Sequence, residues 1–210
     1  MEALGGYPTK SSKVKVNRYT VLLSMTVGVG CLFLLQTKLF SPRKPKDFYS
    51  FEVKDAKGRT VSLERYRGKA SLVVNVASQS EQTEENYRSL QELHRELGTS
   101  HFNVLAFPCG QFGLTEPWGT REIEAFAKST YGVTFPFFSK IKIMGSEADP
   151  AFKFLTESAK KSPKWNFWKF LVSPEGKVVR FWRTEEPMES VRKDAVALVR
   201  DIILKKRVEL

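Results

Sequence analysis

Apolar residues follow two different spacings through most of the chain, and each spacing predicts one kind of element. Short apolar or alternating runs are typical of strands, whereas apolar residues three or four positions apart indicate one face of a helix. The predicted extended segments are residues 48–53, 61–63, 72–77, 102–107, 133–138, 167–172 and 177–183. The predicted helices are residues 83–97, 123–131, 150–160 and 191–205.

The order of these elements predicts the fold class. Turn residues at 54–58 and at Ser173–Gly176 predict two hairpins. The first hairpin is followed by strand, helix and strand, then by two helices, and the second hairpin is followed by the last helix. This order is typical of an α/β fold, and we expect a thioredoxin-like sandwich over residues 47–205.

A different pattern precedes this body. Residues 19–37 carry no charge, and a helix of that length would span about 28 Å, close to the ~30 Å hydrocarbon core of a bilayer. A cleaved signal peptide is the alternative, but no small-residue cleavage site follows the run. We therefore predict a single N-terminal transmembrane helix that acts as a signal anchor. Residues 1–18 precede it, and a proline-containing stalk, residues 38–46, follows it.

The last residues, 206–210, favour one orientation of this anchor. Positive charges are nearly balanced on its two sides, so the flanking charges do not decide the orientation. Arg207–Leu210 resembles a KDEL-type retrieval signal, although Val208 stands where an acidic residue is usual. Such a tail works only in the lumen. We therefore expect a single-pass protein of the endoplasmic reticulum membrane, with residues 1–18 cytosolic and the body lumenal.

Composition excludes several classes of protein. The 210 residues include 34 Lys and Arg against 23 Asp and Glu, a net charge of +11, and 41% are hydrophobic. This balance excludes a polytopic membrane protein and a disordered chain. Two cysteines, Cys31 and Cys109, are too few for a disulfide scaffold, and with two histidines they form no zinc cluster. Basic clusters such as Lys160–Lys161 lack the interleaved aromatics of a nucleic-acid motif, so we expect no nucleic-acid partner.

Two loops are the predicted place of the chemistry. In an open α/β sheet, sites form beyond the carboxyl ends of parallel strands, which here are Ala77–Ser80 and Pro108–Gln111. The first loop precedes the predicted helix 83–97, and Thr83 is the expected N-cap of that helix. The positive end of a helix lowers the pKa of a thiol, so this loop is a favourable place for a reactive cysteine. The chain has Ser80 there instead.

Three motifs, in order, give a family resemblance that covers residues 47–205. Val74–Ser78 reads VNVAS, Phe107–Gly113 reads FPCGQFG, and Trp165–Phe167 reads WNF. These motifs resemble the three signatures of the glutathione peroxidases. The resemblance implies a thioredoxin-like fold and the reduction of hydroperoxides by glutathione or a protein dithiol as co-substrate, with no other cofactor. It also implies protein disulfide isomerases as partners.

The resemblance also implies a site of four residues: a selenocysteine or cysteine, a glutamine, a tryptophan and an asparagine. Ser80 falls at the position of the redox residue. The other three positions are matched by Gln111, Trp165 and Asn166. Each has a structural alternative, because Ser80 could cap the helix, Gln111 could satisfy a turn and Trp165 could pack in the core. Gly110 replaces the asparagine that is usual in its motif.

Cys109 is the only cysteine of the predicted body, and it lies beside the peroxidatic position rather than at it. Three roles stay open for its thiol. It could be a buried motif cysteine, a mixed-disulfide site for a lumenal oxidoreductase, or a substitute peroxidatic residue. A bridge to Cys31 is excluded on geometry, because Cys31 lies within the predicted membrane span.

Two functions follow from the serine at position 80. The family reaction oxidises a thiolate to a sulfenic acid that a second thiol reduces, and serine has no accessible analogue of that step. The chain is therefore either a peroxidase of lumenal hydroperoxide metabolism or a catalytically impaired redox-fold adaptor that binds lumenal oxidoreductases. The 19 residues between Gly145 and Trp165 are too few for both a helix and the long assembly loop of tetrameric relatives. We therefore expect a monomer.

Overall fold

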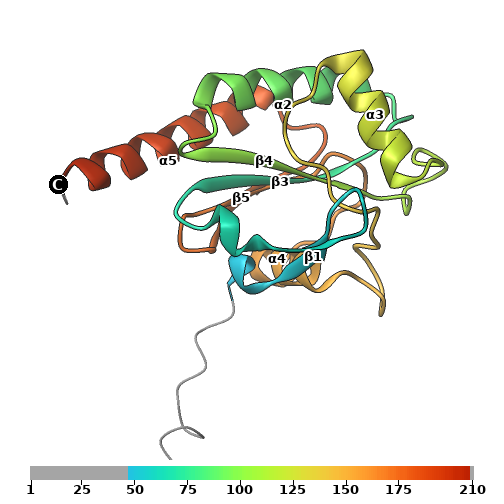
Figure 1. Cartoon of the computed structure of the whole chain (residues 1–210), viewed down its shortest axis with the longest axis horizontal. Helices are drawn as coiled ribbons and strands as arrows, with labels where there is room; N and C mark the ends of the chain where they lie inside the picture. Colours follow the sequence, from blue (N-terminus) through green and yellow to red (C-terminus); the bar gives the residue numbers. More distant parts are fainter. Residues whose placement is uncertain (1–46, 209–210) are drawn as a thin grey trace, which may run out of the picture. The chain divides into compact units, whose positions relative to one another are not determined.

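A four-stranded sheet is the centre of the structure, a computed structural model that describes residues 47–208. All of these residues belong to one unit of the chain, Lys46–Leu210. The strand order is β4 (Phe102–Pro108), β3 (Ala70–Val76), β5 (Lys169–Val172) and β6 (Val178–Trp182). Strands β3 and β4 are parallel, and the other neighbours are antiparallel (Figure 1). Every residue of β3 and β4 is buried, as their continuous apolar runs predict.

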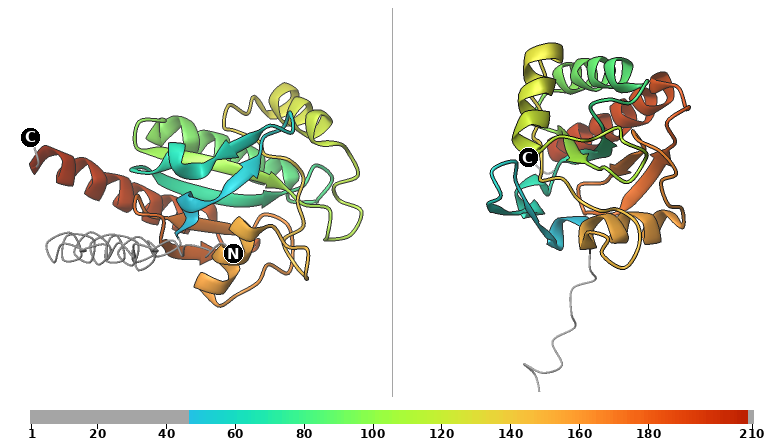
Figure 2. Two further views of the ribbon diagram at one scale, coloured as in Figure 1. Left: turned by 60° about the horizontal axis from the view of Figure 1, so that its bottom comes forward. Right: turned by 90° about the vertical axis from the view of Figure 1, so that its right-hand side faces the viewer.

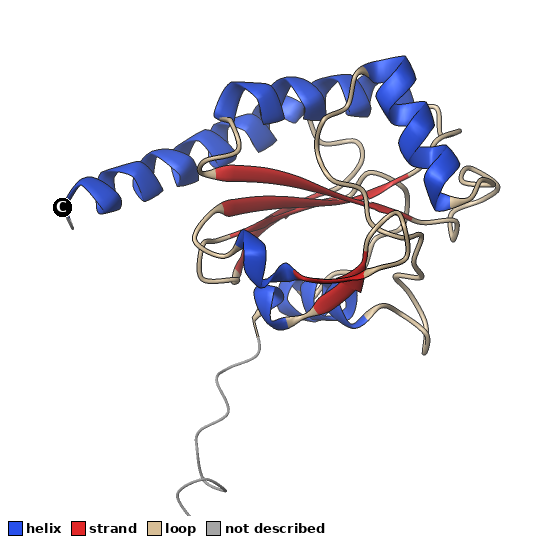
Figure 3. Ribbon diagram, in the orientation of Figure 1, coloured by secondary structure: helices blue, strands red, loops and turns tan. Residues whose placement is uncertain are grey.

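Helices cover one face of this sheet. They are α2 (Thr83–Leu97), α3 (Thr120–Tyr131) and α5 (Met188–Val208), and Figure 3 shows them on the same side of the strands. Their buried side chains share one hydrophobic core with β3 and β4, which includes Tyr87, Ile123 and Val191. Burial of these apolar stripes is what holds the helices on the sheet.

The other face is covered by shorter elements. Helix α4 (Pro150–Ala159) packs there with the hairpin β1 (Glu52–Lys54) and β2 (Thr60–Ser62), as Figure 2 shows. Two short 3-10 helices, η1 (Phe48–Ser50) and η2 (Leu63–Tyr66), flank the hairpin. A second core lies on this face and contains Phe107, Phe138 and Phe152. These two covered faces confirm the predicted thioredoxin-like sandwich.

The predicted elements are confirmed with a few changes at their ends. Residues 48–50 form η1 rather than the start of a strand, because the Asp47 carboxylate caps that turn and accepts a bond from the Tyr49 backbone N–H at 2.9 Å. The predicted segment 133–138 forms only isolated bridges, at Phe137 and Phe138. Pro136 has no N–H, which interrupts a regular ladder there.

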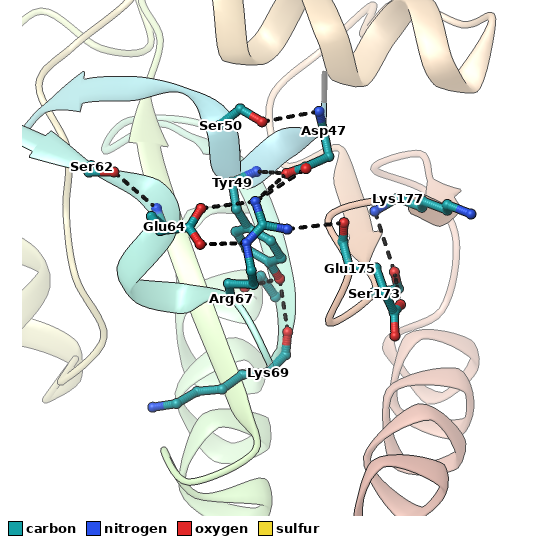
Figure 4. A network of polar contacts seen from close by, with 11 residues as sticks. Asp47, Tyr49, Ser50, Ser62, Glu64, Arg67, Lys69, Ser173, Glu175 and Lys177 are labelled. Carbon is teal, nitrogen blue, oxygen red and sulfur yellow. Dashed lines mark hydrogen bonds and ion pairs between the residues drawn. The ribbon is translucent and has the colours of Figure 1, made fainter. Parts of the chain in front are cut away.

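The first described residues are fixed to the body by a polar network around Arg67 (Figure 4). The Arg67 guanidinium pairs with Asp47 at 2.9 Å and with Glu64 at 2.6 Å, and it lies over the Tyr49 ring. The Phe48 N–H donates to the Gly176 carbonyl at 3.0 Å. A Cβ at Gly176 would stand 2.5 Å from the Asp47 carboxylate, so the turn needs glycine at this close approach.

The predicted N-terminal segments lie outside the described residues, namely residues 1–18, the anchor 19–37 and the stalk 38–46. Within residues 47–208, no helix is both long enough and apolar enough to cross a bilayer. Helix α5 continues through Val208, beyond its predicted end at residue 205. The first residues of the predicted tail 206–210 are therefore helical, and the last two lie outside the described range.

Candidate functional site

Three strand ends meet at one edge of the sheet and bring the predicted loops together. Val76 of β3 pairs with Pro108 of β4, so both parallel strands end at the same level. Strand β5 runs the other way and begins there, with Lys169 opposite Val74. Each loop is tied to its neighbour by the main chain: Cys109 N–H donates to Val76 at 3.1 Å, and Gln79 N–H donates to Thr115 at 2.8 Å.

Ser80 lies in this edge and is connected to Trp165 through a residue that the sequence did not single out. Its side-chain hydroxyl donates to the Gln82 Oε1 atom at 2.8 Å. The Trp165 indole N–H donates to the same oxygen at 3.3 Å. Ser80 is 8% exposed, and Gln82 precedes the first residue of α2. The Gln82 side chain therefore bridges two of the predicted site residues.

The predicted N-cap of α2 is wrong. Gln82 is the cap residue and makes no side-chain capping bond, while Thr83 is the first helical residue. The Thr83 hydroxyl accepts from the Ser80 N–H at 2.9 Å and donates to the Ala77 carbonyl at 3.0 Å. These two bonds fix the loop that carries Ser80 instead of closing the helix end. The loop, and with it the Ser80 side chain, is thereby held at the positive end of α2.

Asn166 is fully buried beside this loop. Its amide nitrogen donates to the Thr115 hydroxyl at 2.9 Å. The oxygen of the same side-chain amide, Oδ1, is buried and has no hydrogen-bond partner within residues 47–208. A buried amide oxygen without a partner is uncommon in a folded protein. Trp165, which precedes Asn166, is 41% exposed, and its ring lies 6.3 Å from that of Phe112.

The backbone of Trp165–Phe167 is held by three side chains. Asn75 donates to the Trp165 carbonyl at 3.0 Å, Thr184 donates to the Asn166 carbonyl, and Lys169 donates to the Phe167 carbonyl at 2.8 Å. Phe167 has φ of 60°, a conformation that L residues adopt only when the surroundings enforce it. This enforced turn is what directs Trp165 and Asn166 to the same edge.

Lys169 and Asn75 were not predicted as site residues, although both interrupt otherwise apolar strands. Lys169 is 1% exposed, and burial lowers the pKa of its ammonium to about 8. Asn75 is fully buried within β3. A polar residue in a buried strand was the available signal, because such a group must find a partner inside the protein.

The Gln111 side chain bonds to the segment of Ile143 and Met144, and within residues 47–208 no hydrogen bond joins it to Ser80, Trp165 or Asn166. Its amide oxygen accepts from the backbone N–H groups of Ile143 and Met144 at 2.6 and 3.0 Å, and its amide nitrogen donates to the Met144 carbonyl at 3.1 Å. These bonds fit the alternative that Gln111 satisfies a turn. Thr115, four residues later, is the side chain that contacts Asn166.

Cys109 is fully buried and is the free cysteine of the described residues. Its sulfur lies 3.8 Å from the Gln111 amide oxygen. Burial raises the pKa of this thiol, which keeps it protonated and slow as a nucleophile. This placement favours the buried motif cysteine among its three predicted roles.

Glu116 is a buried acid next to the site that the sequence analysis did not select. It is 3% exposed, and its carboxylate accepts from the Ser78 hydroxyl at 3.0 Å. Burial raises the pKa of this carboxyl to about 7. Lys140 donates to the Glu116 backbone carbonyl at 3.2 Å rather than to the carboxylate. Within the described part of the chain, no cluster of three or more acidic, histidine or cysteine residues could hold a metal ion.

The family profile and the named relatives agree on one family. The profile of the glutathione peroxidase family matches residues 48–156. The chain is 80% identical to "Probable glutathione peroxidase 8" of Tetraodon nigroviridis and 59% identical to the human protein of the same name, over all of this chain and all of each relative. A crystal structure of "Trgpx in apo form" is 30% identical with a TM-score of 0.63, covering 75% of this chain and 97% of its own.

Proposed function

The chain belongs to the glutathione peroxidase family, and from this premise we propose that it acts in thiol-dependent hydroperoxide metabolism. In the family reaction a hydroperoxide takes two electrons from two thiols: its O–O bond breaks, the two thiol protons go to oxygen, and the products are a disulfide, one water and an alcohol, or two waters from hydrogen peroxide. The observation that carries the proposal is the edge of the sheet where Ser80 and Trp165 share Gln82 beside the buried Asn166. This edge offers polar groups that can hold a hydroperoxide at the start of α2.

We propose that the chain turns over hydroperoxide slowly by itself. The atom at the peroxidatic position is the Ser80 oxygen, which cannot become a sulfenic acid. The only thiol within residues 47–208, that of Cys109, is fully buried, and burial raises its pKa. On this proposal Trp165 and Asn166 stay as positioning groups beside Ser80, while the oxidisable atom is missing.

The second function is a redox-fold adaptor that binds lumenal oxidoreductases at the membrane. The same two features favour it, namely the serine at position 80 and the burial of Cys109. Protein disulfide isomerases are the partners that the family resemblance suggests for both functions. An adaptor requires binding of such a partner that persists whether or not position 80 can be oxidised.

We infer that this function is exercised in the endoplasmic reticulum lumen. The support is the uncharged segment 19–37 together with the retrieval-like residues Arg207–Leu210. Protease treatment of sealed microsomes tests the topology. The body should resist digestion until detergent is added, and a body digested without detergent would overturn the assignment.

The function itself is tested by peroxide consumption with glutathione or with a protein disulfide isomerase as the reductant. Ser80→Cys in the full chain should raise turnover by orders of magnitude, because preorganised donors supply roughly 10²–10³-fold once a nucleophile is present. Ser78→Cys is the matched control, since Ser78 lies in the same loop, is 5% exposed and bonds to Glu116 instead. If Ser80→Cys folds but stays inert, the peroxide site has decayed, and equal binding of a protein disulfide isomerase to both chains would then support the adaptor function.

A further inference from the structure

A hollow of about 510 Å³ lies on the surface beside Trp165. Part of its lining is apolar and comes from Pro163, Trp165 and Trp168. Trp168 is 4% exposed and stacks on Phe181 with ring centres 5.8 Å apart, so it is a fixed wall. Trp165 is the exposed aromatic of the lining, and its indole N–H bonds to Gln82 of the Ser80 site. The hollow and the peroxide site therefore share one side chain.

The rim of this hollow is strongly basic. Its charged residues are Lys160, Lys161, Lys164, Arg183 and Glu185, a net charge of +3. Within residues 47–208 none of the three lysines forms an ion pair, and Arg183 reaches Glu185 only at 4.0 Å. The basic pair Lys160–Lys161 of the sequence thus belongs to one concave, uncompensated patch. Such a patch attracts a ligand that carries several negative charges.

We propose that this hollow is the docking site for an acidic segment of a protein partner. The inference rests on the proposed function in one respect: the partner is the thiol reductant, and docking beside Trp165 brings its thiol to the Ser80 site. The apolar walls and the basic rim together fit an extended acidic peptide, whose backbone and aliphatic stems contact the exposed ring of Trp165 while its carboxylates meet the rim.

Two other anionic partners fit the hollow less well. A bilayer surface is flat on this scale, whereas these lysines surround a concavity. Single-stranded nucleic acid needs several exposed aromatic faces for its bases, and the lining provides one, Trp165, because Trp168 is covered.

The test is fluorescence anisotropy of a labelled, cysteine-free peptide rich in Asp and Glu, mixed with the full chain in detergent. A peptide with Asn and Gln in place of the acids is the matched ligand. The test variant combines Lys161→Glu, Lys164→Glu and Arg183→Glu. The control variant combines Lys193→Glu, Arg200→Glu and Lys206→Glu, three exposed residues of α5 on the opposite face of the sheet, so that the net charge changes equally.

The acidic peptide should bind, and added salt should weaken the binding. The test variant should lose affinity by about tenfold or more, while the control variant should lose much less. Equal losses in the two variants, or equal binding of the neutral peptide, would overturn the proposal. Binding to anionic lipid vesicles that needs the same three residues, without binding of the peptide, would also overturn it. The assay uses the chain with Ser80 and needs no turnover, so its failure is distinct from inertness of Ser80→Cys.

Discussion

Replacing Lys169 with methionine should change how the stability of the chain responds to pH. Lys169 is 1% exposed, and its ammonium donates to the Phe167 carbonyl at 2.8 Å. Burial lowers its pKa from 10.5 to about 8. Methionine fills a similar volume but carries neither charge nor donor. The substitution therefore removes a buried charge and, with it, one of the three bonds that hold the turn of Trp165 and Asn166.

The sign of the effect follows from proton binding in the two states. Below about pH 8 both states carry the proton, so the folded state bears the full penalty of a buried charge. Between about pH 8 and pH 10.5 the unfolded chain binds more protons than the folded chain, so stability rises with pH. From about pH 7 to about pH 10 these two pKa values give a gain of roughly 2.5 kcal/mol for the wild type.

The Lys169→Met variant should lack this gain. Near pH 7 the loss of the hydrogen bond, about 1–3 kcal/mol, is largely offset by removal of the buried charge. The free energy of unfolding of the variant, relative to that of the wild type, should therefore be roughly 2.5 kcal/mol lower near pH 10 than near pH 7. Urea unfolding of the full chain in detergent, followed by tryptophan fluorescence, measures the free energy at each pH.

Lys193→Met is the matched control, because Lys193 is exposed on α5. Its stability should follow that of the wild type at every pH. If the curves for wild type and Lys169→Met run parallel from about pH 7 to about pH 10, Lys169 is not a buried charge in the folded chain. The bond from its ammonium to the Phe167 carbonyl would then not be one of the three that hold the turn of Trp165 and Asn166.

Two further predictions concern other buried contacts. Gly176→Ala should lower the free energy of unfolding by about 1–3 kcal/mol more than Gly58→Ala, measured by urea unfolding, because its Cβ would meet Asp47 at 2.5 Å while that of Gly58 meets nothing within 4 Å. Both glycines have φ near 80°, so equal losses would show that the Asp47 contact is absent. The free energy of unfolding of Glu116→Gln, relative to that of the wild type, should rise by roughly 2.5 kcal/mol between about pH 5 and pH 8. The reason is that the folded carboxyl keeps its proton up to a pKa of about 7 while the unfolded one loses it near 4.5; a difference that does not vary with pH would contradict this.

The fold could be predicted from the sequence where one strong pattern decides an element. Helix α2 ends where its apolar spacing predicts, and the continuous runs of β3 and β4 predict two fully buried strands. The first turn was mistaken for a strand, since η1 depends on one cap from Asp47 and not on periodicity. Local caps and single close contacts, such as that between Asp47 and Gly176, form between residues that meet only once the chain has folded. Periodicity along the sequence therefore does not predict them.

The site could be predicted only as far as motifs name residues. The family resemblance indicated Ser80, Trp165 and Asn166 as site residues. The register of β3 with β4 and β5 places all three at one edge of the sheet. The motifs could not show that Gln82 bridges Ser80 and Trp165, because that contact joins residues far apart in the chain. The direction of the Gln111 amide, toward Ile143 and Met144, is likewise a consequence of how two loops close.

Trapping of sulfenic acid tests most directly whether the edge that carries Ser80, Trp165 and Asn166 lacks only its oxidisable atom. The full chain with Cys31→Ser, with and without Ser80→Cys, is treated with a limiting amount of hydroperoxide in the presence of a sulfenic-acid probe. Mass spectrometry then locates the label. We expect labelling at position 80 in the Ser80→Cys variant and none at the buried Cys109 in either chain. Rapid labelling of Cys109 in the chain that retains Ser80 would contradict the account, because Cys109 would then be the working thiol.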